Sequence, residues 1–182
     1  MDQKPSSRTL LTRAALKLFR RHGYAGVGIS EILAETGLPK GSLYHHFPQG
    51  KKQLAQEAVL LANRIILDTV EDSFVSASTF NNGATLLCRA VAAMAQDGAS
   101  IAGCPVLGTL QADDGEHDLQ KLAAEIVAGW TEEVSKHAIR FGLDGPEDAA
   151  SLLLMKIEGA WLLAKVQQSM TPFRILERDL NR

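Results

Sequence analysis

The chain has 182 residues and an apolar fraction of 46%, which is enough for a folded core without disulfide bonds. Its formal net charge of −2 hides an uneven distribution. Residues 1–55 carry nine lysines and arginines against three acids, whereas residues 56–182 carry ten against eighteen. A basic end of this kind is typical of a segment that faces nucleic acid. Aromatic residues make up only 5%, and no long period-2 run is found, so an all-α fold is expected.

Several classes of protein are excluded by simple patterns. Cys88 and Cys104 are too few for a disulfide framework. The first residues are polar, and no apolar run reaches about 18 residues, so we expect a cytoplasmic protein without a membrane partner. The histidines are scattered apart from the adjacent His45 and His46, so we expect no metal site and no cofactor. His137 lies on an apolar helix face, where a satisfied, half-buried histidine is expected.

The first predicted helix begins at Ser6 or Ser7 and runs to about His22, and Gly23 ends it. Its buried stripe contains leucine, alanine and phenylalanine at helical spacing. Its basic residues lie off that stripe, where they are candidate phosphate contacts or an ordinary solvated face. These residues are Arg13, Lys17, Arg20 and Arg21.

Residues 30–47 contain two short helical patterns that are separated by Gly37. The first pattern covers residues 30–36, and Gly37 can adopt the left-handed conformation that ends a helix. Pro39 opens the second helix at a position where its missing N–H costs nothing, and this helix runs to about His45. A helix, a four-residue turn and a short helix are the outline of a helix-turn-helix.

The second of these helices has little to bury, because only Leu43 and Phe47 are suited to a core. The rest of its surface offers a cation, bare backbone, a hydroxyl, a phenol and two imidazoles, which suits a groove lined with phosphates and base edges. An ordinary polar surface helix would show the same pattern, because helix-turn-helix geometry also occurs without DNA.

The run from Gly23 to Leu54, GYAGVGISEILAETGLPKGSLYHHFPQGKKQL, resembles the DNA-binding region of the TetR family of transcriptional repressors. The matching features are GY at the end of the first helix, the apolar core that ends in Thr36-Gly37, and KGSLYHHF followed by a lysine. Gly28, at a position usually held by Ser or Thr, and the lengthened link at Gln49-Gly50 depart from the commonest pattern. Together with the later segment GCPV, they resemble the LmrA/YxaF branch.

The remaining chain reads as a helical body. A long helix over about residues 51–75 would join the basic end to the acidic body. After it, the sequence predicts a loop over residues 76–83, helices over about 84–96, 118–142 and 146–169, and a last helix that begins at Thr171-Pro172. Residues 101–111 suggest a turn that enters a short apolar helix, and residues 112–117 an acidic turn.

The resemblance implies an all-α homodimer with a helix-turn-helix DNA-binding domain over residues 1–50. A helical ligand-binding and dimerisation domain would follow over residues 51–182. The implied partner is double-stranded DNA with a palindromic operator, read by a dimer. The candidate DNA-binding residues are Ser30, Pro39, Lys40, Gly41, Ser42, Tyr44, His45, His46 and Lys51.

The helix over residues 146–169 has two apolar rows, and a single core needs only one. The second row fits a dimer interface such as the family forms from its last two long helices, although a monomer core would also use it. The candidate interface residues are Leu152, Gly159, Leu163, Val166, Met170 and Phe173.

The GCP segment at residues 103–105 resembles those that, in the LmrA/YxaF branch, open a helix lining the ligand cavity. The implied effector is a small hydrophobic or aromatic molecule that releases the repressor from DNA. Plain core packing is the alternative for every candidate ligand residue. These candidates are Leu61, Ile65, Met94, Cys104, Leu107, Ile126, Trp130 and Trp161.

Three other functions compete with a ligand-responsive repressor. A helical small-molecule-binding or scaffold protein would lack the DNA function. An enzyme would need converging titratable residues, and none is found at a suitable spacing, so we expect no enzyme activity. A redox sensor would use Cys88 and Cys104, whereas a small packing residue is expected at Cys104.

Overall fold

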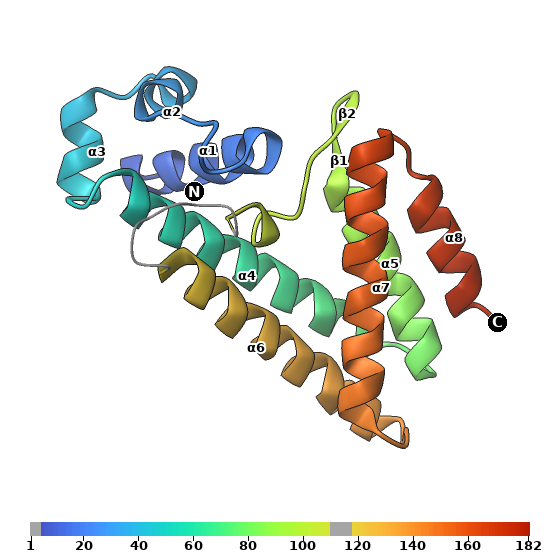
Figure 1. Cartoon of the computed structure of the whole chain (residues 1–182). Coiled ribbons are helices and arrows are strands. Elements are labelled where there is room, and N and C mark those ends of the chain that lie inside the picture. Colours follow the sequence, from blue (N-terminus) through green and yellow to red (C-terminus); the bar gives the residue numbers. More distant parts are fainter. Residues whose placement is uncertain (1–4, 110–117) are drawn as a thin grey trace. The chain divides into compact units, whose positions relative to one another are not determined.

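The computed structural model describes residues 5–109 and 118–182. Within these ranges the chain forms eight α-helices, a short 3₁₀ helix and one two-stranded hairpin, which confirms the all-α prediction (Figure 1). The elements are α1 (Ser7–His22), α2 (Ile29–Thr36), α3 (Lys40–His46), α4 (Lys51–Val75), α5 (Phe80–Ala95), β1 (Gln96–Asp97), β2 (Ser100–Ile101), η1 (Leu107–Thr109), α6 (Asp118–Arg140), α7 (Pro146–Gln167) and α8 (Thr171–Leu180).

The chain divides into two compact units. Unit 1 contains the described residues of Met1–Arg64 and Pro105–Ala124, and unit 2 contains Ile65–Cys104 and Glu125–Arg182. Both α4 and α6 therefore contribute residues to each unit. The expected domain division after residue 50 stays a prediction about function, because compactness alone does not delimit a functional domain.

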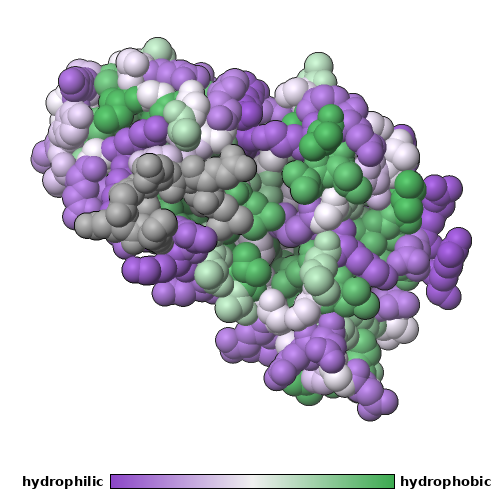
Figure 2. Space-filling view, in the orientation of Figure 1, coloured by the Kyte–Doolittle hydropathy of each residue, from purple (hydrophilic) through white to green (hydrophobic). Residues whose placement is uncertain are grey.

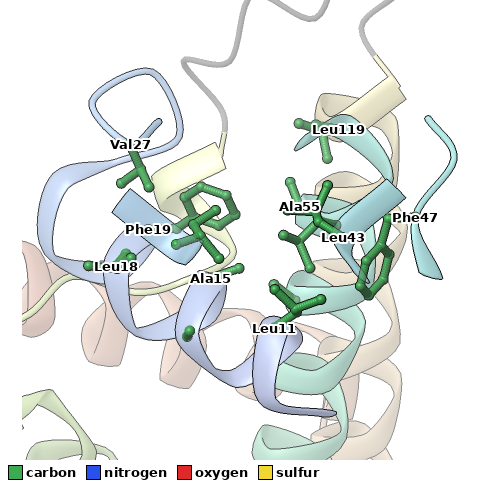
Figure 3. Close-up of a cluster of buried hydrophobic side chains, with 13 residues drawn as sticks. Leu11, Ala15, Leu18, Phe19, Val27, Leu43, Phe47, Ala55 and Leu119 are labelled. Carbon is green, nitrogen blue, oxygen red and sulfur yellow. The ribbon is translucent and has the colours of Figure 1, made fainter. Parts of the chain in front are cut away.

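Unit 1 is built on α1, whose N-terminus is capped by the Ser6 side chain, which accepts a hydrogen bond from the Thr9 N–H at 3.2 Å. Helix α1 packs against both α2 and α3. Its apolar stripe forms one buried cluster with α2, α3, the start of α4 and the start of α6 (Figure 3). The cluster contains Leu11, Ala14, Ala15, Leu18, Phe19, Val27, Ile32, Leu43, Phe47, Leu54, Ala55, Ala58 and Leu119.

Unit 2 is a helical body in which α5 packs against α7 and α8, and α7 and α8 lie side by side (Figure 1). Its largest buried side chains include Trp130 of α6 and Trp161 of α7, both 2% exposed. Gly83 of α5 lies against the ring of Phe74, so closely that a Cβ at this position would clash with it. That close approach explains why a helix-destabilising residue is tolerated in the first turn of α5.

Two expectations about local structure are corrected. Helix α5 begins at Phe80 instead of residue 84, because Thr79 is an N-cap whose side chain accepts a hydrogen bond from the Asn82 N–H at 3.1 Å. The Ser/Asn/Gly-rich segment is therefore partly a helix start and not wholly a loop. A short hairpin, β1–β2, also follows α5, with Gly98 between its strands at a φ of 64°.

The other predicted boundaries agree to within a few residues, and the predicted acidic turn at 112–117 lies outside the described residues. Among the helices that the structure describes, none has the length and apolar character needed to cross a membrane.

Candidate nucleic-acid interface

The turn between α2 and α3 is set by Gly37, which has a φ of 67° in the left-handed region. In this conformation its N–H donates to the Leu33 carbonyl at 2.9 Å and closes α2, as predicted. Pro39 is the N-cap of α3, with a ψ of 152°, and Lys40 is the first helical residue. The helix therefore begins one residue later than expected, because Pro39 keeps an extended ψ.

Leu43 of α3 and its C-cap residue, Phe47, pack the helix into the core of unit 1. Leu43 and Phe47 are four residues apart and fully buried, at 0% exposure each. They gather with Leu11 of α1 and Ala55 of α4 (Figure 3). The sequence prediction that only these two residues of the helix serve the core is confirmed, so the rest of the α3 surface is available for other contacts.

The outer face of α3 carries the predicted polar residues. Lys40, Gly41, Tyr44 and His45 are exposed, whereas Ser42 and His46 are half-buried. A Cβ added to Gly41 would meet no other atom within 4 Å among the residues that the structure describes. Packing in this chain therefore does not require a glycine at position 41, and the bare backbone there faces open space.

Aromatic rings hold two of the lysines. The Lys40 ammonium lies 5.9 Å from the centre of the Tyr44 ring, and the Lys51 ammonium lies 4.2 Å from the centre of the Tyr24 ring. Burial lowers the pKa of Lys51. Both cations are therefore positioned by ring contacts and keep N–H donors that an incoming phosphate can use.

Two other lysines of unit 1 are in ion pairs. Lys17 pairs with Glu35 at 2.6 Å, and this hydrogen bond holds the pKa of Glu35 below its usual value. Lys52 pairs with Asp118 at 2.7 Å. Exposed pairs of this kind are weak, so these lysines are available to exchange a carboxylate for a phosphate. Lys17 and the exposed Arg13 are two of the predicted electrostatic contacts.

Arg8 is a positioning residue that sequence reasoning missed. Its guanidinium lies 5.0 Å from the centre of the Phe47 ring, donates to the His46 carbonyl at 3.4 Å, and pairs with Glu57 at 2.6 Å. It thus links the start of α1 to the end of α3 and to α4. The contact with His46 joins residues 38 positions apart, so no local pattern in the sequence announces it.

Comparison with known proteins identifies the family to which this arrangement belongs. Residues 11–58 match the model of the bacterial regulatory proteins of the tetR family. Residues 79–179 match the C-terminal domain of LmrA/YxaF-like transcriptional regulators. The chain belongs to the TetR family. It is a transcriptional regulator with a DNA-binding helix-turn-helix, and it falls in the LmrA/YxaF-like branch that its sequence resembles.

Two relatives agree with this assignment over nearly the whole chain, and a solved structure shares its fold. HTH-type transcriptional regulator YxaF of Bacillus subtilis is 28% identical over 99% of this chain and 96% of YxaF. HTH-type transcriptional regulator LmrA of Bacillus subtilis is 31% identical over 91% of this chain and 90% of LmrA. A cysteine mutant of the TetR family regulator CifR, complexed with 26bp double-strand operator DNA, matches with a TM-score of 0.80 at 18% identity, covering 100% of this chain and 98% of CifR.

The predicted ligand residues of this TetR family member are placed in both units. Leu61 and Leu107, both half-buried, belong to unit 1, and the others belong to unit 2. Ile126, Trp130, Trp161 and Cys104 are buried, Met94 is half-buried and Ile65 is 42% exposed. Their burial is compatible with core packing as well as with a cavity lining, so their role stays a prediction.

Ala102 and the first two residues of the GCP segment, Gly103 and Cys104, pack on α7 within unit 2. The indole Nε1 of Trp161 donates to the Ala102 carbonyl at 2.8 Å. The Cys104 thiol hydrogen-bonds to Glu158, which lowers the pKa of that carboxyl, but burial has the larger effect and raises it to about 7. A carboxyl with a raised pKa next to the GCP segment was not anticipated, because the two lie more than fifty residues apart.

The predicted interface residues lie on α7 and α8, but they differ in exposure. Leu152, Leu163 and Val166 are exposed at 50%, 49% and 73%, and Gly159 and Met170 are half-buried. Phe173 is only 3% exposed, so it lies in the core of the single chain and not on the exposed face.

The same two helices expose further aliphatic side chains that the prediction did not include. These are Met155 at 64%, Leu162 at 63% and Ile175 at 54%. A groove of about 680 Å³ runs along α7 and α8, and Met155, Gly159, Leu163 and Ile175 are among its lining residues. Figure 2 shows apolar surface over the part of the molecule where these helices lie.

Proposed function

We propose that the chain is a ligand-responsive repressor that binds a palindromic operator as a homodimer and is released by a small hydrophobic or aromatic molecule. The observation that carries the proposal is the two-sided character of α3. Leu43 and Phe47 anchor its inner face, while Lys40, Gly41 and Tyr44 are presented outward. A short helix of this kind fits the major groove, where a recognition helix reads base edges.

The proposed contacts divide by chemistry. Lys40, Tyr44, His45, His46 and Lys51 would bind phosphates, because they carry cations, imidazoles or a phenol at the rim of the helix. Two small residues, at positions 41 and 42, would lie closest to the groove floor. Base readout would use a few residues at the start of the helix, namely Pro39, Lys40, Ser42 and Tyr44, with Ser30 of α2 as a backbone contact.

Two further observations support DNA as the partner. The first is the positive charge of residues 1–55, which contain nine lysines and arginines but only three acids. The second is that the CifR mutant, whose fold matches this chain, is complexed with operator DNA. A regulator of this kind works where the chromosome is, so we place it in the cytoplasm.

A homodimer would use the exposed aliphatic face of α7 and α8. Large apolar side chains that are half exposed or more, such as Leu163 and Val166, are unfavourable in water when they form a contiguous patch. A second copy would cover them through a two-fold interface, in which the same surface of both chains is used. The two recognition helices of the dimer would then bind the two half-sites of a palindromic operator.

Release by a ligand requires that the ligand bind one conformation better than the other. A differential of about 1–3 kcal/mol changes DNA affinity roughly 5–150-fold. Helix α4 is continuous from Lys51 to Val75 and has residues in both compact units, so it is the element that a ligand bound in unit 2 would displace. The buried GCP segment and the apolar residues near it supply the proposed ligand environment.

The test is selection of duplexes from a random pool by the purified chain, repeated with a panel of hydrophobic compounds. The proposal expects an enriched sequence with two inverted halves, and loss of its retention with at least one compound. Failure to enrich any sequence at low salt would favour the alternative of a helical small-molecule-binding or scaffold protein. Enrichment that only an oxidant abolishes would favour a redox sensor, although burial and Glu177 raise the pKa of Cys88 to about 11, which disfavours its thiolate.

A further inference from the structure

His137 of α6 has a buried ring nitrogen that makes no hydrogen bond to the described residues. The residue is buried, with 7% exposure, and no hydrogen-bond partner for its Nε2 atom lies within residues 5–109 and 118–182. The sequence led us to expect a half-buried histidine with its hydrogen bonds satisfied, whereas the residue is buried and its Nε2 atom makes no hydrogen bond within the described part of the chain. A buried polar atom without a partner is unfavourable, so the groups around Nε2 indicate what it is placed to bind.

The orientation of the His137 ring is fixed by Phe74 of α4. The two rings are stacked, with centres 4.6 Å apart and planes 12° from parallel. Phe74 is itself buried, and its carbonyl accepts a hydrogen bond from the Arg140 guanidinium at 3.2 Å. The imidazole is therefore held with its Nε2 atom 3.5 Å from the Glu71 Oε2 atom.

A second carboxylate converges on the same point. Glu133 and His137 are four residues apart on α6, so they lie on one face of that helix. One donor atom from each of Glu71, Glu133 and His137 lies within 4.8 Å of the other two. Glu71 is exposed and Glu133 is half-buried, so the cluster is open to solvent on the carboxylate side. The cluster is therefore approached from the side of the two carboxylates, where Glu71 lies at the surface.

The charges around the cluster leave room for a cation. Lys136 lies 2.9 Å from the Glu133 Oε2 atom and 3.6 Å from the Glu132 Oε1 atom. The hydrogen bond with Glu133 raises the pKa of Lys136. This lysine engages one oxygen of Glu133 and leaves the second oxygen to other ligands.

We propose that Glu71, Glu133 and His137 form a binding site for a divalent transition-metal ion of the zinc type. One imidazole nitrogen and two carboxylate oxygens suit such an ion, whereas magnesium and calcium take oxygen ligands. Zinc bonds of about 2.0–2.2 Å place tetrahedral ligand atoms about 3.4 Å apart, close to the 3.5 Å between Nε2 and Oε2. The mobile carboxylate side chains supply the remaining adjustment, and water completes the coordination.

The site would join α4 to α6 inside unit 2, because Glu71 comes from the former and the other two ligands from the latter. The proposal does not depend on DNA binding, so failure of the operator experiment leaves it standing. In the same way, a chain that binds no metal can still bind its operator.

The test is calorimetric titration of Zn²⁺ into the full-length, tag-free chain after removal of metal with a chelator. We expect one tight site per chain. Glu71→Gln and Glu133→Gln keep the shape of the side chain and remove one ligand charge, so each should weaken zinc binding at least tenfold, and His137→Gln should abolish the tight site. Glu132→Gln is the matched control, because this carboxylate pairs with the same lysine but lies outside the cluster, and it should bind as the unchanged chain does.

A second measurement separates this site from other zinc ligands, such as the adjacent pair His45 and His46. At a Co²⁺ concentration that just fills the site of the unchanged chain, the bound ion should give visible absorption that is much reduced in Glu71→Gln and retained in His45→Gln. The two carboxylate variants decide the matter if His137→Gln fails to fold, because their side chains are not in the core. Equal zinc affinity in the three ligand variants and the unchanged chain, or no zinc binding at all, would overturn the proposal.

Discussion

The replacement Gly41→Ala separates folding from DNA recognition in α3. The added methyl group would meet no other atom within 4 Å among the described residues, so the fold has space for it. It would stand on the exposed side of the helix, beside Lys40 and Tyr44. If α3 enters a groove with its bare backbone facing the base edges, this methyl group holds the helix away from them.

The replacement should change the stability of the chain and its DNA affinity in opposite directions. Alanine is the better helix former by about 0.5–1 kcal/mol, so the stability of the variant should stay equal or rise. Loss of one close polar approach costs about 1–1.5 kcal/mol, which is close to a factor of ten in affinity. Because a dimer would place two copies of α3 on one operator, the combined loss should be about a hundredfold.

Fluorescence anisotropy with a labelled operator measures the affinity, and chemical denaturation measures the stability. The matched control is Gly129→Ala in α6, where a Cβ would also meet no other described atom within 4 Å. It should gain a similar stability and keep full DNA affinity. Unchanged DNA affinity in Gly41→Ala would refute the account, because the outer face of α3 would then not approach the duplex.

Three further changes test other parts of the account. Gly83→Ala should lower the stability by more than 1 kcal/mol in denaturant titration, since its methyl group would clash with the Phe74 ring. Glu158 has its pKa raised by burial from 4.5 to about 7, so the folded state loses stability as pH rises from about 4.5 to above 7. Glu158→Gln should remove that loss of stability, which reaches about 3 kcal/mol at pH 8. Thermal unfolding of both proteins at pH 5 and pH 8 measures it. If the variant and the unchanged chain show the same dependence of stability on pH, burial does not raise the pKa of Glu158. Leu163→Glu should halve the mass by light scattering, whereas Ile139→Glu, an equally simple change at a 62% exposed position of α6, should leave a dimer.

The helix-turn-helix could be predicted because its signals are local. Gly37 ends α2 through its own backbone conformation, and Leu43 and Phe47 lie one helical turn apart, so their spacing alone reveals the buried side of α3. The start of α5 differs from the predicted one because a local signal can be ambiguous. Thr79 in a polar run can be either a loop residue or a cap, and only the geometry of its hydrogen bond to Asn82 decides.

The contacts that join distant residues could not be predicted. Arg8 reaches the end of α3 across 38 positions, and Glu71 approaches His137 across more than sixty. Such pairs depend on how whole helices pack, and periodicity reports only which face of a helix is buried. The same limit applies to Phe173, which the sequence suggests for a dimer interface and which is found in the core.

The most direct test of the account is the mass and salt dependence of the complex with a selected operator. Light scattering should give two chains per duplex. The logarithm of the binding constant should fall linearly with the logarithm of salt concentration, by about 0.9 for each phosphate contacted. A single chain per duplex, or retention of random and selected duplexes with equal affinity, would contradict the claim that paired α3 helices read an operator.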